Sequence, residues 1–208
     1  MIVASVSAMA AVSTGADTSI TINGLSTGDT VNLYRVLSWN TTTGGWEVAT
    51  GFGDLIDSTK DNYSANFKKL VDNDNSFVAL EKADVEKIAN LAKNGAAIIN
   101  TGAQTVSGTS YTYDSFSSDA DLGLFIALVE PNDVNTVYNP IIVSADFTTG
   151  GSNEIDSSET MGSSAVAKKE TITLNKEQSD ITLDAGELVK FTITTTIPAY
   201  SDSYVDRC

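Results

Sequence analysis

Polar and apolar residues alternate along several short segments, and this alternation is typical of strands with one buried face. The turn residues Asn23-Gly24 and Thr27-Gly28-Asp29 separate the first two segments, which we therefore expect to pair with each other. A stretch of Thr and Gly, residues 41–45, separates the next two segments as a hairpin turn would. The strands predicted in this part are residues 18–22, 30–37, 37–39 and 46–48.

A helical period replaces the strand period in two segments further along the chain. Spacings of three and four residues place apolar side chains on one face of each predicted helix. Asn94-Gly95 provides the usual stop for the second helix. The apolar faces are Tyr63, Phe67, Leu70 and Val71 in the first helix and Val85, Ile88, Leu91 and Ala92 in the second.

Strand patterns return in the second half of the chain. Residues 102–118 are rich in Ser, Thr, Gly and Tyr, which predicts short strands or a hairpin around Ser107-Gly108. The apolar run 122–129 is too continuous for a half-exposed strand, so we expect it in the centre of a sheet. Pro131-Asn132-Asp133 closes that strand, and residues 138–147 predict the last strand of a first domain.

A change of composition marks a domain boundary after these strands. Residues 148–164 are mainly Gly, Ser, Thr and acids, and they form either a long surface loop or the approach to a linker. The strand pattern resumes at Val166, so we place the boundary near Ala165. The resulting scheme has residues 17–165 as the first domain and residues 166–208 as the start of a second.

Two lysine positions stand out in the strands after this boundary. Alternation places Lys176 on the same face as Ile172 and Leu174, towards the core, and turns Lys169 to the other face, towards solvent. An inward amine is costly unless it is paired, neutral or covalently bonded, because desolvation disfavours its charged form. The alternative is that the Lys176 side chain extends its amine to solvent.

Composition and charge narrow the class of function. The 208 residues are 41% hydrophobic, which is enough for a packed core. A formal net charge of -15 argues against nucleic-acid or membrane-surface binding, because both need clustered Lys and Arg. The chain contains no His, which excludes Ser-His-Asp and Cys-His catalysis. Cys208 is its only cysteine, so an intramolecular disulfide is excluded.

The first residues are small and apolar, and Ala8-Met9-Ala10 fits the A-x-A pattern of a signal-peptidase site, although no basic region precedes it. We interpret residues 1–16 as the remnant of a secretion signal, which implies a secreted protein with no membrane in its mature form. The alternative is an ordinary first strand that starts at Ile2. No other segment approaches the length of a membrane-spanning helix.

Two other candidate sites have simpler explanations. Residues 72–76 are acids, Asn and Ser, as in a calcium loop, but Phe77 and Ala83 stand where an EF-hand needs Gly and Glu. Trp39 and Trp46 flank the predicted hairpin and would suit a sugar-binding platform, yet aromatic residues on strands are more often core. We therefore expect a polar loop and a pair of core tryptophans.

Several motifs, in order along the chain, resemble the sortase-assembled major pilins of Gram-positive bacteria. They are Tyr34-Arg35-Val36-Leu37, Gly51-Phe52-Gly53, the runs 122–129 and 138–146, Ala167-Lys168-Lys169, Thr173-Leu174-Asn175-Lys176 and Ile197-Pro198-Ala199-Tyr200. The resemblance covers nearly the whole chain. It implies a mainly β fold: a β-sandwich-like N-terminal pilin domain with a short helical insertion, followed by the first strands of an incomplete immunoglobulin-like isopeptide domain.

The resemblance also implies roles for the lysines. Lys176 would form an intramolecular isopeptide bond with an asparagine that we expect beyond Cys208, in a reaction that needs a neutral amine, a polarised carboxamide and no cofactor. Members of the family offer a lysine of a Tyr-Pro-Lys motif to sortase. This chain has Tyr138-Asn139-Pro140 instead, so we assign the acceptor role to Lys169 or Lys168. The alternative is a solvated pair of charges.

We therefore predict a structural subunit of a covalently polymerised pilus shaft at the bacterial cell wall, which supports adhesion and colonisation. Its partners would be other copies of the pilin and a sortase, with host glycan or matrix protein as the ligand in adhesion. The alternative is a monomeric surface adhesin for such a ligand. An enzyme is the weakest class, because without His only carboxylate pairs remain and none has a diagnostic spacing.

Overall fold

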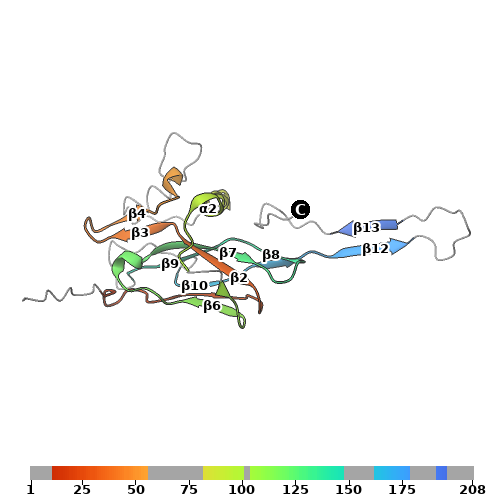
Figure 1. Cartoon of the computed structure of the whole chain (residues 1–208), viewed down its shortest axis with the longest axis horizontal. Coiled ribbons are helices and arrows are strands. Elements are labelled where there is room, and N and C mark those ends of the chain that lie inside the picture. The colour runs from red at the N-terminus through yellow and green to blue at the C-terminus, as the bar shows by residue number, and fades with distance from the viewer. Residues whose placement is uncertain (1–10, 56–81, 101–103, 148–161, 179–190, 196–208) are drawn as a thin grey trace, which may run out of the picture.

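The structure is a computed structural model that describes residues 11–55, 82–100, 104–147, 162–178 and 191–195. Two sheets form the body of the molecule, with strand orders β10-β1-β6 and β5-β2-β7-β9 (Figure 1). Their bounds are β10 Ser164–Val166, β1 Ile20–Asn23 and β6 Ser110–Tyr113, and β5 Gln104–Thr105, β2 Thr30–Arg35, β7 Gly123–Glu130 and β9 Ile141–Ala145. Strand neighbours are antiparallel in both sheets except β1 and β10, which are parallel.

The hydrophobic core lies between these sheets and continues under the helix α2 (Lys82–Gly95). On β1, Ile20 and Ile22 are fully buried while Thr21 and Asn23 face outward and are half-buried, as alternation requires. The four-stranded sheet lies between the three-stranded sheet and α2 in Figure 1, so that its central strand β7 is covered on both faces. This position explains the continuous apolar run 122–129, and the prediction of a central strand is confirmed.

Local predictions for the second helix and for the hairpin are also confirmed. The helix α2 buries Ile88, Ala89 and Ala92, and Gly95 is its last residue. The strands β3 (Leu37–Asn40) and β4 (Gly45–Val48) form the hairpin, in which Trp39 and Trp46 are register partners. The first predicted helix, with Tyr63, Phe67, Leu70 and Val71, and the polar segment 72–76 lie outside the described residues.

The two tryptophans are core residues, as expected. Both are buried, and their ring centroids lie 5.0 Å apart in an edge-to-face arrangement. The ring of Phe147 packs edge-on against Trp39 at 4.9 Å. A sugar-binding platform needs exposed rings, so this pair does not provide one.

The predicted pairing of residues 18–22 with residues 30–37 is wrong. The corresponding strands lie in different sheets: β1 pairs with β6 and β10, and β2 pairs with β5 and β7. The connection between them runs beside residues 106–109, where Gly28 N donates to the Val106 oxygen and Val106 N donates to the Asp29 oxygen, each at 2.8 Å. Turn residues show where a chain bends, but the neighbour of each strand is chosen by long-range packing.

Two further strand predictions also differ from the structure. Residues 102–118 form the short strands β5 and β6, but these join different sheets, so the alternative of a hairpin around Ser107-Gly108 is wrong. The single strand predicted over residues 138–147 is two strands, β8 (Thr136–Tyr138) and β9. Asn139-Pro140 separates them because proline has no N–H to donate to a strand ladder.

The C-terminal strands differ in whether they pair with the body. Strand β11 (Lys169–Thr171) pairs antiparallel with β8 of the body, with Lys169 opposite Tyr138. Strand β12 (Leu174–Gln178) pairs with β13 (Phe191–Thr195) and with no other described strand, and Figure 1 shows these two extending beyond the body. The domain scheme of residues 1–16, 17–165 and 166–208 stays a prediction.

Candidate functional site

The three lysines singled out from the sequence, Lys168, Lys169 and Lys176, are all exposed. Lys168 stands just before β11, and its backbone oxygen accepts a hydrogen bond from Asn139 N at 3.0 Å. This contact and the β8–β11 ladder bring the Lys168-Lys169 pair beside Tyr138-Asn139-Pro140. The segment that lacks the expected lysine in sequence therefore has two lysines next to it in space.

The amine of Lys169 is held in one direction by the body. Its Nζ donates a hydrogen bond to Ser26 Oγ at 2.8 Å. The same nitrogen lies 5.8 Å from the ring centroid of Tyr138, within the range of a cation–π contact. Lys169 is exposed, as predicted, but so are the other two residues of β11, and its register partner Tyr138 is buried. Alternation therefore does not distinguish Lys169 from its neighbours, and the two contacts with the body orient its amine.

A buried carboxylate lies behind this contact. Asp29 is only 1% exposed, and its Oδ2 accepts hydrogen bonds from Ser26 N at 2.7 Å and from the Tyr138 hydroxyl at 2.6 Å. Its Oδ1 accepts from Asn132 N at 3.0 Å. Burial, followed by the hydrogen bond to Asp29, raises the pKa of Tyr138, so the phenol keeps its proton and serves as the donor.

Sequence reasoning missed Ser26 and Asp29 as members of this site. Asp29 was recognised only as a turn residue, and Ser26 is separated from Lys169 by 143 residues. The one local signal was the cluster of turn residues between two strands, which indicates a loop but not its neighbour. Tyr138 was noted for its motif and not for its hydroxyl group.

Lys176 lies in a different environment from the one predicted. It does share a face of β12 with Leu174, and its register partner on β13 is Ile193, which therefore lies on that face too. The prediction that this face is buried is wrong, because Leu174 and Ile193 are 66% and 62% exposed and no described element covers them. The Lys176 amine lies 4.2 Å from the ring centroid of Phe191, which replaces the expected core contact.

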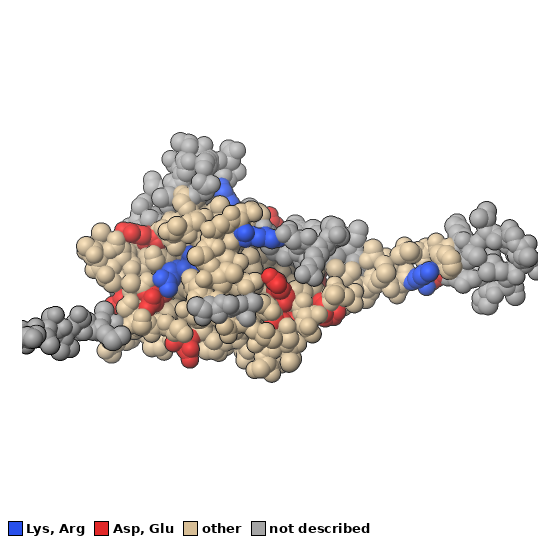
Figure 2. Space-filling view, in the orientation of Figure 1, with Lys and Arg blue, Asp and Glu red and all other residues tan. Residues whose placement is uncertain are grey.

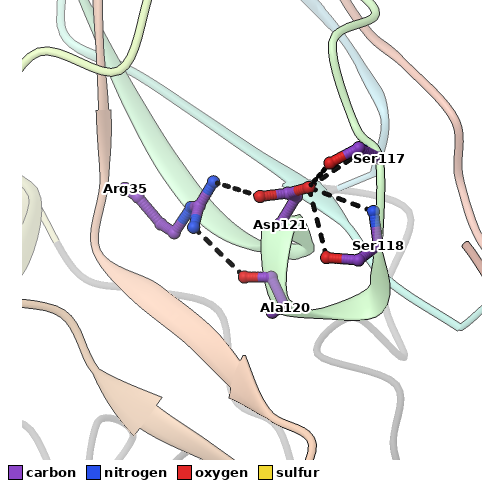
Figure 3. Close-up of polar contacts among 5 residues, drawn as sticks. All are labelled: Arg35, Ser117, Ser118, Ala120 and Asp121. Carbon is purple, nitrogen blue, oxygen red and sulfur yellow. Dashed lines mark hydrogen bonds and ion pairs between the residues drawn. The ribbon is translucent and has the colours of Figure 1, made fainter. Parts of the chain in front are cut away.

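A second polar cluster surrounds the carboxylate of Asp121 (Figure 3). Asp121 Oδ2, in the short 3-10 helix η2 (Asp119–Asp121), accepts hydrogen bonds from Ser117 N at 2.9 Å and from Ser118 N at 3.0 Å. Its Oδ1 lies 3.6 Å from Arg35 Nη2, and Arg35 Nη1 donates to the Ala120 oxygen at 3.1 Å.

These contacts change the ionisation of Asp121. Burial acts to raise the pKa of Asp121, but the hydrogen bonds from Ser117 and Ser118 and the charge of Arg35 together lower it. Every partner in the cluster is a neighbouring group of the same fold. We therefore assign the cluster to fold stability and not to ligand binding.

Other kinds of site find little support in the described part of the chain. There, no three His, Cys, Asp or Glu side chains are grouped as metal ligands. No helix among the described elements is long and apolar enough to cross a membrane. On the face shown in Figure 2, the basic side chains of the described residues stand apart, without the patch that nucleic-acid binding uses.

The comparisons with known proteins agree with this fold. Residues 16–174 match the family model described as the T6 antigen Ig-like domain. No curated protein matches the chain. Among solved structures, the chain is similar to the T6 backbone pilin of serotype M6 Streptococcus pyogenes, a modular three-domain protein, with a TM-score of 0.59 and 17% sequence identity.

That likeness covers 91% of this chain and 37% of the streptococcal chain, so this chain spans little more than a third of that pilin's length. At this level of identity the likeness bears on the fold alone. The mainly β, sandwich-like class predicted from the sequence is confirmed. The family match covers well over half of the chain, and the chain belongs to the T6 antigen Ig-like domain family.

Proposed function

We propose that the chain is part of a structural subunit of a covalently polymerised pilus on the surface of a Gram-positive bacterium. Membership of the T6 antigen Ig-like family and a fold shared with a streptococcal backbone pilin support this function. The observation that carries it is the presentation of Lys169, which is exposed on β11, a strand that pairs with the body, and whose amine is oriented by Ser26. An acceptor of an acyl group needs both properties.

The chemistry of polymerisation would be acyl transfer to the lysine nitrogen. A sortase would hold the C-terminal acyl group of one subunit as a thioester on its cysteine. The neutral amine of Lys169 attacks the carbonyl carbon, the thiolate leaves with the bonding electron pair, and the nitrogen loses a proton. The product is an amide between two subunits, and this route needs no cofactor.

Lys168 is the second candidate acceptor. It is also exposed, but no side-chain contact to another described residue fixes the direction of its amine. A fixed nucleophile loses less entropy when it enters the enzyme's active site. We therefore assign the acceptor role to Lys169.

We assign to Lys176 the role of an internal isopeptide lysine. The face around it supports this role, because Leu174, Ile193 and Phe191 form an apolar surface that further strands of a sandwich would cover. Such cover would desolvate the amine and favour its neutral, nucleophilic form. Intact-mass measurement tests this role, because an isopeptide bond between the Lys176 amine and an asparagine side chain releases one ammonia.

Adhesion and colonisation would follow from display of the polymer at the cell surface. The alternative of a monomeric adhesin loses its one candidate platform, because Trp39 and Trp46 are buried. We find no site among the described residues that favours direct binding of host glycan or matrix protein.

The test uses the 208-residue chain as acceptor, a pilus-assembling sortase, and a donor peptide with a threonine-glycine cleavage site. We expect one donor acyl group per chain, mapped to Lys169 by peptide mass spectrometry. Lys169→Arg should abolish coupling, whereas the matched variant Lys168→Arg should retain it. Coupling at the wild-type rate in the double variant would overturn the assignment of this pair.

A further inference from the structure

We propose that Gly24, Ser26 and Asp29, in the connection between β1 and β2, position the amine of Lys169 and so select it over Lys168 as the acyl acceptor. The inference rests on the proposed function and deepens it, because it identifies what decides between two adjacent lysines. Ser26 contacts the amine directly, whereas Gly24 and Asp29 act through the backbone on either side of Ser26.

The connection first fixes the backbone that leads to Lys169. Strands β1 and β10 pair in parallel up to Asn23 and Val166, and Ala167 N then donates to the Asn23 oxygen at 2.7 Å. Gly24 has a φ of +80°, and a Cβ atom added there would stand 3.1 Å from the Ala167 oxygen. A side chain at position 24 would therefore strain the turn and press on the chain just before the lysine pair.

Asp29 then fixes the place of Ser26. Asp29 Oδ2 accepts from Ser26 N at 2.7 Å, and Asp29 N donates to the Ser26 oxygen at 3.1 Å, so the two residues close a turn. The same carboxylate accepts from the Tyr138 hydroxyl at 2.6 Å and from Asn132 N at 3.0 Å. Because Tyr138 is the register partner of Lys169, the turn is tied to the strand that lies opposite the lysine.

These attachments bring the Ser26 hydroxyl to the Lys169 amine. Lys169 Nζ donates to Ser26 Oγ at 2.8 Å, across 143 positions of sequence. A neutral amine has two N–H groups and one lone pair, so one N–H can stay on Ser26 Oγ while the lone pair is free to attack. The serine therefore restricts the direction of the amine and leaves its nucleophilic lone pair available.

This contact is compatible with every stage of acylation. The Lys169 nitrogen bonds to the carbonyl carbon of the thioester, the bond from that carbon to sulfur breaks, and the thiolate leaves with the electron pair. The nitrogen gives up its other proton, which balances the thiolate as a thiol. The amide that forms keeps one N–H, and Ser26 Oγ can accept it.

Lys168 provides the internal comparison. Its backbone is held as well, because the Lys168 oxygen accepts from Asn139 N at 3.0 Å. Its side chain is exposed, and no contact to another described side chain directs the amine. The two lysines therefore differ in side-chain order, and an amine ordered in advance loses less rotamer entropy on reaction. We expect this difference to favour Lys169 by at least about tenfold.

The first measurement needs no sortase. Carbon-13 relaxation of the lysine-labelled 208-residue chain gives an order parameter for each lysine Cε, with Lys168→Arg and Lys169→Arg used to assign the two signals. The order parameter should be higher for Lys169 than for Lys168. Ser26→Ala and Gly24→Ala should lower it to the Lys168 value, whereas Ser26→Thr, which keeps the hydroxyl, should preserve it.

Two further variants test Asp29 and the specificity of the effect. Tyr138→Phe breaks the link from Asp29 to β8 but keeps the aromatic ring, so it should give an intermediate order parameter. Thr27→Ala is the matched control, because it removes another hydroxyl of the same connection, one that donates to the Gly108 oxygen at 3.3 Å. It should leave the order parameter of Lys169 unchanged. Thermal unfolding of each variant checks that its fold is intact.

The second measurement is the rate of sortase coupling to the donor peptide, mapped by peptide mass spectrometry. Ser26→Ala should lower kcat/KM for coupling at Lys169 about tenfold, since the amine must then be ordered during the reaction. Ser26→Thr should restore the rate, and Thr27→Ala should not change it. A merely structural role for Ser26 would not make the rate follow the order of this one side chain.

Equal order parameters for the two lysines in the unmodified chain would overturn the inference. So would a Ser26→Ala chain in which Lys169 loses its order but couples at the wild-type rate. An ordered Lys169 amine that sortase does not couple would refute the proposed function, while the positioning of the amine would stand. Coupling at Lys169 with equal order parameters would support the function and refute the positioning.

Discussion

Lys169 and Lys176 carry the same amine on successive strands, yet they lie in different settings. Strand β11 pairs with the body, and the Lys169 amine meets Ser26 and Tyr138, which come from distant parts of the chain. Strand β12 pairs with β13 alone among the described strands, and the Lys176 amine meets Phe191 of its own strand pair. One lysine is oriented by tertiary structure and the other by a single neighbouring strand.

The difference shows that alternation alone does not give a lysine its chemistry. Alternation chooses the face on which a side chain lies, but the segments that cover that face decide its solvation and its partners. The same contrast should hold for stability. Buried side chains of the body should each contribute several kcal/mol to the free energy of unfolding. The exposed side chains of the β12–β13 pair should contribute little to it.

The largest loss is expected at Gly123, where β7 passes close to β3. A Cβ atom at this position would overlap the backbone oxygen of Leu37, and a backbone atom cannot shift as cheaply as the end of a flexible side chain. Gly123→Ala should therefore cost more than about 4 kcal/mol or prevent folding, as judged by urea unfolding followed by circular dichroism.

The matched change for Gly123 is Gly108→Ala, because an added Cβ atom there would have nothing within 4 Å. Its cost should stay within about 0.5 kcal/mol. A Gly123→Ala chain that unfolds at the wild-type urea concentration would show that β3 and β7 are not held at this distance.

Two leucines test the contrast between the regions directly. Leu124 on β7 is fully buried, and truncation to Ala should cost about 3 to 5 kcal/mol because it leaves a cavity. Leu174 on β12 is 66% exposed, and the same truncation should change the free energy of unfolding by less than about 0.5 kcal/mol. Equal losses in urea unfolding would mean that the β12–β13 pair belongs to the cooperative core.

The next largest loss of stability is expected when a buried side-chain amide is replaced. Asn100 accepts a hydrogen bond from Leu33 N at 2.9 Å and donates to the Val31 oxygen at 2.7 Å, which satisfies backbone groups on β2. Asn100→Leu leaves both groups buried without a partner, so we expect a loss of about 2 to 4 kcal/mol in urea unfolding. The exposed Asn175 of β12 is the matched control, and its change to Leu should have almost no effect.

The sequence predicted those parts of the fold that depend on local periodicity. Helix α2, the β3–β4 hairpin and the central position of β7 each follow from the spacing of apolar residues within one segment. The pairing of β1 with β2 failed because partner choice depends on the segment 106–109, which lies far along the chain. The pattern of residues within one segment does not identify a neighbour that is distant in the sequence.

The candidate site also has features that the sequence predicted and features that it did not. The exposure of Lys169 was predicted, although all three residues of β11 are exposed and alternation does not single it out. Its contact with Ser26, which in turn binds Asp29, required the tertiary structure. The burial predicted for Lys176 failed because the pattern describes an apolar face but not the element that covers it. An apolar face therefore predicts that some element covers it. The pattern does not say which element that is.

The smallest effect is expected at Asp121, and it should depend on pH. Its folded-state pKa is lowered, so its contribution to stability is present above the unfolded-state pKa of about 4 and is lost as pH falls through the folded-state pKa. Asp121→Asn removes the charge that faces Arg35 and weakens the hydrogen bonds from Ser117 and Ser118. The cost should be about 1 to 2 kcal/mol at neutral pH.

Urea unfolding at neutral pH and at about pH 3 measures this dependence. The difference between the unmodified chain and Asp121→Asn should shrink on acidification, because protonation removes the same charge that the substitution removes. Asp114→Asn, an exposed change outside the cluster, should show no such trend. A difference that persists at low pH would mean that Asp121 acts through its shape and hydrogen-bond geometry, and that its charge is not what joins η2 to β2.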